Sequence, residues 1–234
     1  MITIGVTGGV GAGKSEILRY LDNNYNCRIL MSDNAAKELE APGGILYEPL
    51  VKLLEETASD GSGYGPLLLE NGEIDKQEMA RRIFSDPLLL TKINELVHPA
   101  VNKYIHEEIA REKESGEKEF FILESALLIE NGYDRILDSM WYIYCEESVR
   151  CSRLKASRGY SDEKIRSIMM RQVSEEVFRT HCDTVIDNTP GFDGPGGAAS
   201  QVDEAVARLR ERFGTEKALR RTYNKQENRY EQKT

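Results

Sequence analysis

The stretch "GVTGGVGAGKSEI" at residues 5–17 constrains the fold more than any other part of the sequence. It holds five glycines, although glycine weakens both strands and helices. An apolar run, "ITIGV" at 2–6, precedes it, and Ile17, Leu18 and Leu21 follow with the spacing of an amphipathic helix. The pattern therefore predicts a first strand, a tight glycine-rich loop and a first helix.

Residues 8–15 match the pattern G-x-x-x-x-G-K-[ST]. Glycines let such a loop curl so that backbone N–H groups face a phosphate, and the following helix points its positive end at the same anion. Lys14 would then reach the β- and γ-phosphates, and the Ser15 hydroxyl would bind Mg²⁺. The dinucleotide pattern G-x-G-x-x-G fails because Lys14 stands where its last glycine is required. We predict a nucleoside triphosphate site with Mg²⁺, and a glycine-rich turn without a ligand is the alternative.

Short apolar runs alternate with helical patterns along the chain, which predicts an α/β protein with a doubly wound parallel sheet. The long segment between the second and third runs is expected to be helical, with Asp86-Pro87 starting a helix and His98-Pro99 interrupting one. A loop is expected at 59–66 and a final helix at about 201–213. The five predicted strands are residues 2–6, 28–31, 120–123, 140–145 and 184–187.

The composition narrows the class of protein. A net charge of −9 argues against a nucleic-acid-binding protein, which needs a basic face. The four cysteines are widely spaced and suggest thiols of a reducing compartment. We find neither a secretory signal nor an apolar run long enough for a membrane span, so we expect a cytoplasmic protein. The sequence does not determine the oligomeric state.

Four further residues stand where phosphoryl-transfer chemistry needs charge. Asp33 follows the second strand, where a carboxylate could accept the proton of an acceptor hydroxyl, and a cap of the next helix is the alternative. Glu124 follows the third strand, at the position of an acidic metal ligand, with a plain polar strand end as the alternative. Arg153 and Arg158 lie in a basic helix that ends at a Gly–Tyr–Ser turn, which suggests a lid that stabilises phosphoryl charge or, alternatively, a solvated basic face.

Taken in order, several segments make the chain resemble the dephospho-coenzyme A kinase family. These segments together cover most of residues 2–190. They are "GVTGGVGAGKS" (5–15), "SDNAAKEL" (32–39), "NGEIDKQEMARRIF" (71–84), "HPAV" (98–101), "ALLIENG" (126–132), "RLKASRGYS" (153–161) and "TVIDN" (184–188). The resemblance implies a P-loop kinase fold with a five-stranded core, a helical insertion that binds the coenzyme, and a lid. It also implies transfer of the ATP γ-phosphate to the ribose 3′-hydroxyl of dephospho-coenzyme A.

The resemblance assigns a role to each matching position. Asp33 matches the base of the family, Lys14, Arg153 and Arg158 act on the phosphates, and His98 falls in the part that receives the coenzyme. Ser15 and Glu124 are the expected Mg²⁺ ligands. The predicted ATP-binding residues are Gly8, Gly9, Val10, Gly11, Ala12, Gly13, Lys14, Ser15 and Glu16.

The expected division is a core at 1–37 and 118–213 with a lid at about 150–172, a coenzyme-binding insertion at 38–117, and a polar tail at 214–234. The chain departs from the family pattern at two positions near the site. Met31 stands where the family has an aspartate, and Glu16 stands where a threonine is common. Two other functions remain open: another P-loop small-molecule kinase, or a nucleotide-binding module that has lost catalysis.

Overall fold

The structure is a computed structural model that describes residues 1–56 and 64–231. Of the loop expected at 59–66, residues 59–63 lie outside the described residues. The chain divides into two compact units, one made of Met1–Ile29 with Glu117–Thr234, and the other of Leu30–Gly116. Each unit is considered by itself below.

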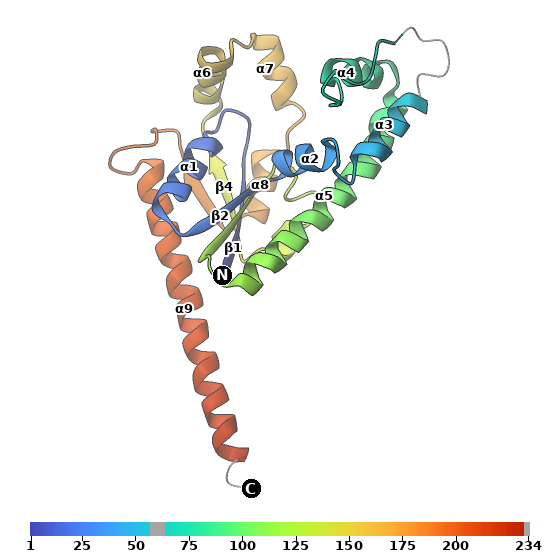
Figure 1. Ribbon diagram of the computed structural model, residues 1–234. Helices are drawn as coiled ribbons and strands as arrows, with labels where there is room; N and C mark the ends of the chain where they lie inside the picture. The colour runs from blue at the N-terminus through green and yellow to red at the C-terminus, as the bar shows by residue number, and fades with distance from the viewer. Residues whose placement is uncertain (57–63, 232–234) are drawn as a thin grey trace. The chain divides into compact units, whose positions relative to one another are not determined.

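A five-stranded sheet carries the fold (Figure 1). The strand order is β2-β3-β1-β4-β5, and the β1–β3, β1–β4 and β4–β5 pairs are parallel, which confirms the predicted parallel α/β architecture. Parallel neighbours cannot be joined by hairpins, so helices make the crossovers. The strands are β1 (Ile2–Thr7), β2 (Cys27–Met31), β3 (Phe120–Glu124), β4 (Ser139–Tyr144) and β5 (Thr184–Asp187).

The main core lies between this sheet and two helices, α1 (Lys14–Asn24) and α9 (Ala198–Glu231). Ile4 on the central strand pairs in register with Ile122, and its neighbour Val6 pairs with Trp141; all four side chains are fully buried. Each such side chain contributes about 1.5–3 kcal/mol when removed from water. The apolar runs of the sequence are therefore the central strands of the sheet.

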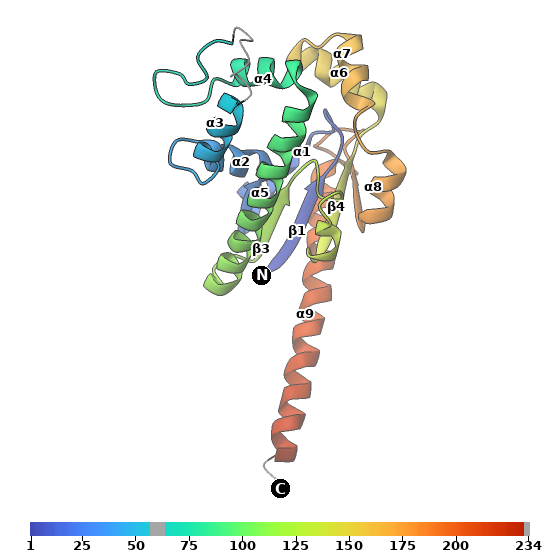
Figure 2. The ribbon, with the colours of Figure 1, turned by 90° about the vertical axis from the view of Figure 1, so that its right-hand side faces the viewer.

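The helices that follow β4 are α6 (Glu147–Arg158), α7 (Asp162–Met169) and α8 (Glu175–His181). α8 packs on β4, where the rings of Phe178 and Tyr142 stack with their centroids 4.6 Å apart. α6 and α7 lie beyond the carboxyl end of β4 (Figure 2). A short 3₁₀ turn, η1 (Tyr133–Arg135), precedes β4.

The second unit is helical, as the sequence predicted for this part of the chain. It contains α2 (Ser32–Glu40), α3 (Tyr47–Glu56), α4 (Lys76–Ser85) and α5 (Pro87–Ser115). The buried Arg82 of α4 donates from Nε to the Glu78 carboxylate at 3.1 Å and from Nη1 to the carbonyl oxygen of Leu54 at 2.8 Å. These bonds satisfy a guanidinium that would otherwise be costly to bury.

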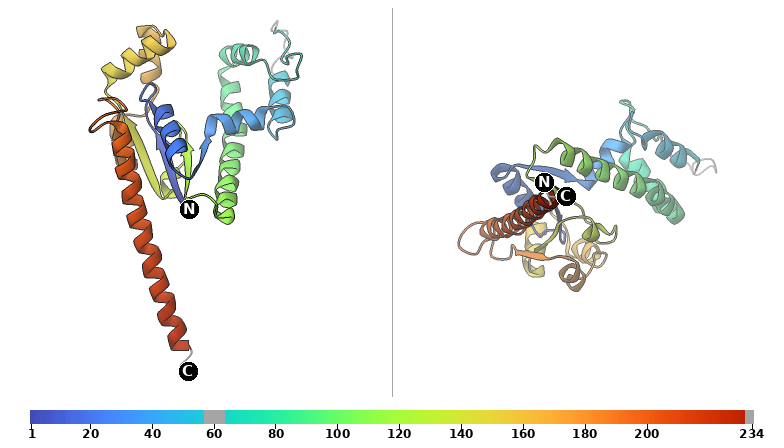
Figure 3. Two further views of the ribbon diagram at one scale, coloured as in Figure 1. Left: turned by 60° about the vertical axis from the view of Figure 1, so that its left-hand side comes forward. Right: turned by 90° about the horizontal axis from the view of Figure 1, so that it is seen from below.

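The predicted interruption at His98-Pro99 is wrong, because α5 runs unbroken from Pro87 to Ser115 with Pro99 inside it (Figure 3). A proline within a helix costs about 3 kcal/mol. Val97, Val101 and Ile105 are buried along one face of α5, on both sides of the proline. Burial of this continuous apolar face offsets the lost backbone hydrogen bond. The predicted start of the helix is confirmed, since the Asp86 carboxylate accepts from Leu88 N–H.

The last helix is longer than the sequence pattern indicated. α9 begins at Ala198 and reaches Glu231, whereas we expected a helix at about 201–213. No proline occurs after residue 195 to end it. Within the described part of the chain, no helix is long and apolar enough to cross a membrane.

Candidate active site

The glycine-rich segment forms a loop between β1 and α1, as predicted. Gly8, Gly11 and Gly13 have φ angles of 147°, 80° and 94°, in a region that other residues rarely adopt. Gly13 is the N-cap of α1 and supplies no side-chain cap. Among the described residues, the N–H groups of Gly11, Gly13 and Ser15 have no protein acceptor. A loop of free N–H groups at a helix N-terminus is suited to bind an anion.

Lys14 lies folded back against this loop. Its Nζ donates to the carbonyl oxygen of Gly8 at 2.8 Å and lies 3.7 Å from Glu124 Oε1. Glu124 is the last residue of β3, next to β1 in the sheet, and its side chain is 12% exposed. The structure therefore brings two of the predicted site residues together at the carboxyl end of the central strands.

Asn188 is a site residue that the sequence analysis did not single out. It directly follows β5 and is fully buried, and its Nδ2 donates to the carbonyl oxygen of Ala12 at 2.9 Å. A Cβ added at Gly13 would lie 2.2 Å from this Nδ2. Asn188 therefore supports the loop from behind, and an amide side chain directly after a strand was the signal that could have revealed it.

Arg153 of α6 also reaches this part of the site. Its Nη2 donates to the carbonyl oxygen of Asn188 at 2.9 Å, and its Nη1 lies 3.5 Å from the sulfur of Cys145. Burial raises the pKa of the Cys145 thiol, which keeps it neutral beside the guanidinium. Arg158, at the end of α6, is exposed, and its guanidinium lies 5.8 Å from the ring centroid of Tyr160.

Gln172 is the second residue that the sequence analysis missed. It follows α7, and its Oε1 accepts a hydrogen bond from the Val10 N–H at 3.3 Å. The bond links the predicted lid to the loop. A glutamine in a polar turn carries no sequence signal of such a contact.

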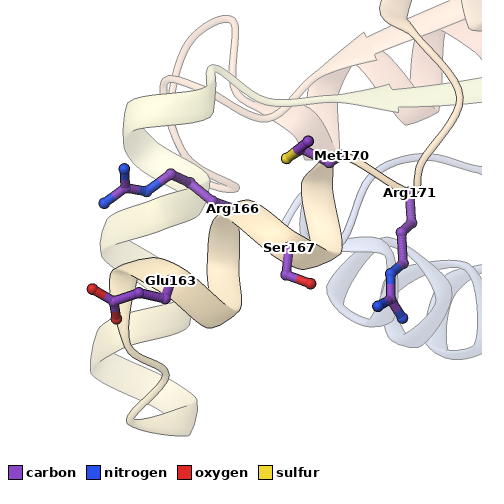
Figure 4. A pocket seen from close by; sticks show the side chains of 5 residues that line it. All are labelled: Glu163, Arg166, Ser167, Met170 and Arg171. Carbon is purple, nitrogen blue, oxygen red and sulfur yellow. The ribbon is translucent and has the colours of Figure 1, made fainter.

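A hollow of about 640 Å³ lies along α7, and Figure 4 shows the side chains that line it. Arg166 and Arg171 extend from it in different directions and do not converge on one point. It therefore lacks the geometry of an anion site. Its lining residues are Glu163, Arg166, Ser167, Met170 and Arg171.

Asp33 and His98 belong to the helical unit. Asp33 lies exposed in the first turn of α2, and the N-cap of that helix is Met31, so the alternative that Asp33 caps the helix is wrong. His98 is half-buried on α5. Of the two predicted metal ligands, Ser15 is exposed at the start of α1, whereas Glu124 lies beside Lys14.

The fold and the loop together define an α/β protein with a P-loop, the class that binds nucleoside triphosphates through its glycine-rich turn. The sequence model of the family described as "Dephospho-CoA kinase" matches residues 2–193. The chain therefore belongs to the dephospho-CoA kinase family.

Individual relatives cover nearly the whole chain. A dephospho-CoA kinase of Corynebacterium diphtheriae is 30% identical over 217 residues, which cover 92% of this chain and 99% of the relative. One from Streptococcus mutans is 29% identical over 206 residues, covering 88% and 96%. Among solved structures, a protein from Thermus thermophilus matches with a TM-score of 0.69 and 28% identity, covering 89% of this chain and 97% of that one. Dephospho-CoA kinase from Campylobacter jejuni, 17% identical with a TM-score of 0.63 over 88% of this chain and 96% of that one, shares the fold.

Proposed function

We propose that this chain transfers the γ-phosphate of ATP to the ribose 3′-hydroxyl of dephospho-coenzyme A, giving coenzyme A and ADP, the last step of coenzyme A synthesis. One observation carries the proposal: a P-loop with Lys14 and Glu124 side by side, in a chain that the kinase family model matches over residues 2–193. A P-loop alone would support any triphosphate-binding protein.

Different residues perform different parts of the phosphoryl transfer. The bond between the γ-phosphorus and the β–γ bridging oxygen breaks, and the acceptor oxygen forms the new bond to phosphorus. Lys14 and the lid residues Arg153 and Arg158 stabilise the charge on the phosphoryl oxygens. Asp33 accepts the proton of the 3′-hydroxyl; its exposed carboxylate in the first turn of α2 supports this role, because it is not committed to capping the helix.

The donor groups also fit a magnesium ion. Mg²⁺ in such sites takes one or two protein oxygens and completes its shell with phosphate oxygens and water. The Ser15 hydroxyl and the Glu124 carboxylate are the two protein ligands that we assign to it. When bound, the ion neutralises charge on the triphosphate.

The helical unit offers room for the acceptor. A hollow of about 590 Å³ lies within it, with apolar walls from Pro42, Leu69 and Ile74 and two cations, Lys37 and Lys76. Lys76 is paired with Glu40 at 2.7 Å. Glu40, Glu73 and Asp75 also line the hollow, so its charge does not favour a diphosphate. Its apolar walls suit the long thiol-bearing arm of the coenzyme, which supports the assignment of 38–117 as the coenzyme-binding insertion.

We place the reaction in the cytoplasm. The described cysteines Cys27, Cys145, Cys151 and Cys182 are free thiols, and three of them are buried, which suits a reducing compartment. The small molecules ATP and dephospho-coenzyme A are the only partners that the proposal requires.

The test is a coupled measurement on the purified chain with ATP, Mg²⁺ and dephospho-coenzyme A. ADP should appear in equal amounts with a product that carries one added phosphate on the ribose 3′-oxygen, identified by mass spectrometry and by phosphorus resonance. Omission of Mg²⁺, or replacement of the acceptor by coenzyme A, should stop the reaction.

Two results would contradict the proposal. If the folded chain phosphorylates other small alcohols or nucleosides and leaves dephospho-coenzyme A unchanged, it is a different small-molecule kinase. Tight ATP binding without transfer to any acceptor would instead indicate a module that has lost catalysis.

A further inference from the structure

Arg150, in the first turns of α6, lies directly against the phosphate loop. A Cβ added at Gly9 would lie 2.1 Å from Arg150 Nη1. Gly9 is absent from the glycines with positive φ, so its backbone does not require glycine. The guanidinium of Arg150 occupies the space that a side chain at this position would need, and it would have to move to admit one.

Among the residues that the structure describes, the Arg150 side chain is also a cation without a hydrogen-bond or ion-pair partner. Its Nε is buried and has no hydrogen-bond partner, and its side chain makes no ion pair within the described part of the chain. By contrast, Lys14 contacts Gly8 and Glu124, and Arg153 contacts Asn188 and Cys145. Leaving a buried polar group unsatisfied is costly, so a half-buried guanidinium in this state indicates a ligand that completes it.

The surroundings show from which side such a ligand reaches Arg150. A cavity of about 500 Å³ has both Arg150 and Gly9 of the phosphate loop in its lining, so an anion held by the loop and the guanidinium share one space. Glu146, Glu147 and Glu175 line the same cavity. Their negative charge disfavours an anion on their side and favours the end of the cavity at the loop.

We propose that Arg150 is a further catalytic residue of this kinase, one that binds the β- and γ-phosphates of ATP held in the loop. The ligand chemistry is that of a nucleoside triphosphate, and the guanidinium donates charge-assisted hydrogen bonds to the phosphate oxygens. Gly9 serves this role by leaving room for the side chain. The inference rests on the proposed function only in taking ATP as the donor.

The first experiment measures nucleotide affinity without any acceptor. Calorimetric titration of Arg150→Met with the Mg²⁺ complex of adenylyl imidodiphosphate should show affinity reduced about 10- to 100-fold, the size expected for a lost charge-assisted hydrogen bond. Affinity for AMP, which lacks both outer phosphates, should change less than about twofold. Arg208→Met on α9 is the matched control, because Arg208 is 62% exposed and pairs with Glu204 of its own helix; it should leave both affinities unchanged.

A second set of variants tests whether Gly9 and Arg150 act together. Gly9→Ala should reduce affinity for the triphosphate analogue as Arg150→Met does, because the new methyl group displaces the guanidinium. In the double variant Gly9→Ala/Arg150→Met the losses should not multiply, since the second change removes a contact that is already lost.

Two outcomes would overturn the inference: triphosphate affinity within twofold of the parent in Arg150→Met, or an equal loss for AMP and the triphosphate analogue, which would indicate a deformed loop. If Arg150→Met does not fold, as judged by circular dichroism, Arg150→Gln is held to the same criteria. The titrations need no acceptor, so a chain that binds ATP through Arg150 and leaves dephospho-coenzyme A unchanged would contradict the proposed function alone.

Discussion

Replacing Gly13 by alanine tests how tightly the phosphate loop is held by the rest of the protein. Gly13 has φ 94° and ψ 21°, and a Cβ at this position would lie 2.2 Å from Asn188 Nδ2. Gly132 provides a matched comparison in the same unit, with φ 70° and ψ 24° and nothing within 4 Å of an added Cβ. The two substitutions share the backbone cost and differ in the contact with Asn188.

The expected magnitudes follow from these two terms. A side chain in the left-handed region costs about 1–2 kcal/mol, and both variants lose this much. Gly13→Ala also displaces the Asn188 amide from its 2.9 Å bond to Ala12, which leaves buried polar groups unpaired at a cost of about 1–3 kcal/mol. We therefore expect a loss of about 2–5 kcal/mol for Gly13→Ala and about 1–2 kcal/mol for Gly132→Ala.

The assay is thermal unfolding followed by circular dichroism, with nucleotide affinity measured on the same samples. In a domain of this size, 1 kcal/mol corresponds to roughly 2–4 °C in Tm, so Gly13→Ala should melt about 2–12 °C below Gly132→Ala. ATP affinity should fall in Gly13→Ala only, because the displaced amide no longer supports the loop.

Equal melting temperatures for the two variants would refute this reasoning, because the contact with Asn188 would then carry no energy. A second check is the double variant Gly13→Ala/Asn188→Ala. Removing the amide relieves its overlap with the new methyl group. The double variant should therefore lose less stability than the sum of the losses in Gly13→Ala and Asn188→Ala.

Four further predictions concern the site and the pH dependence of stability. Lys14→Met should abolish turnover, measured as ADP release. Glu124→Gln should raise the Mg²⁺ concentration needed for half-maximal turnover. If that Mg²⁺ concentration is unchanged, Glu124 is not a ligand of the metal. Asp33→Asn should lower kcat by about 10²- to 10⁴-fold with unchanged ATP affinity, and undiminished kcat would exclude it as the base. Burial raises the pKa of the Cys182 thiol to about 12 from 9.0, so the unfolded chain loses this proton first and stability should fall as pH rises above 9. In Cys182→Ala, the free energy of unfolding by urea should decline less steeply with pH between pH 9 and 11 than in the parent, by up to about 1.4 kcal/mol per pH unit. Identical slopes in the two proteins would contradict the raised pKa of the Cys182 thiol.

The sequence alone determined the features that depend on neighbouring residues. The strand, loop and helix around residues 2–24 follow from apolar runs and glycines that are adjacent in the chain, and the structure has them as predicted. The five strands and the parallel sheet follow for the same reason, since period and length are local signals. The capped start of α5 at Asp86 is local as well.

Only the tertiary structure decided what supports the phosphate loop. Asn188 and Gln172 contact it from 176 and 162 residues further along the chain, and such a separation leaves no local pattern. The same holds for Gly9, beside which the guanidinium of Arg150 on α6 occupies the space that a side chain would take. At Pro99, burial of Val97 and Val101 outweighed the local tendency of proline to interrupt a helix. Local backbone preferences amount to a few kcal/mol at most, and packing between distant segments is large enough to override them or to add contacts that they do not encode.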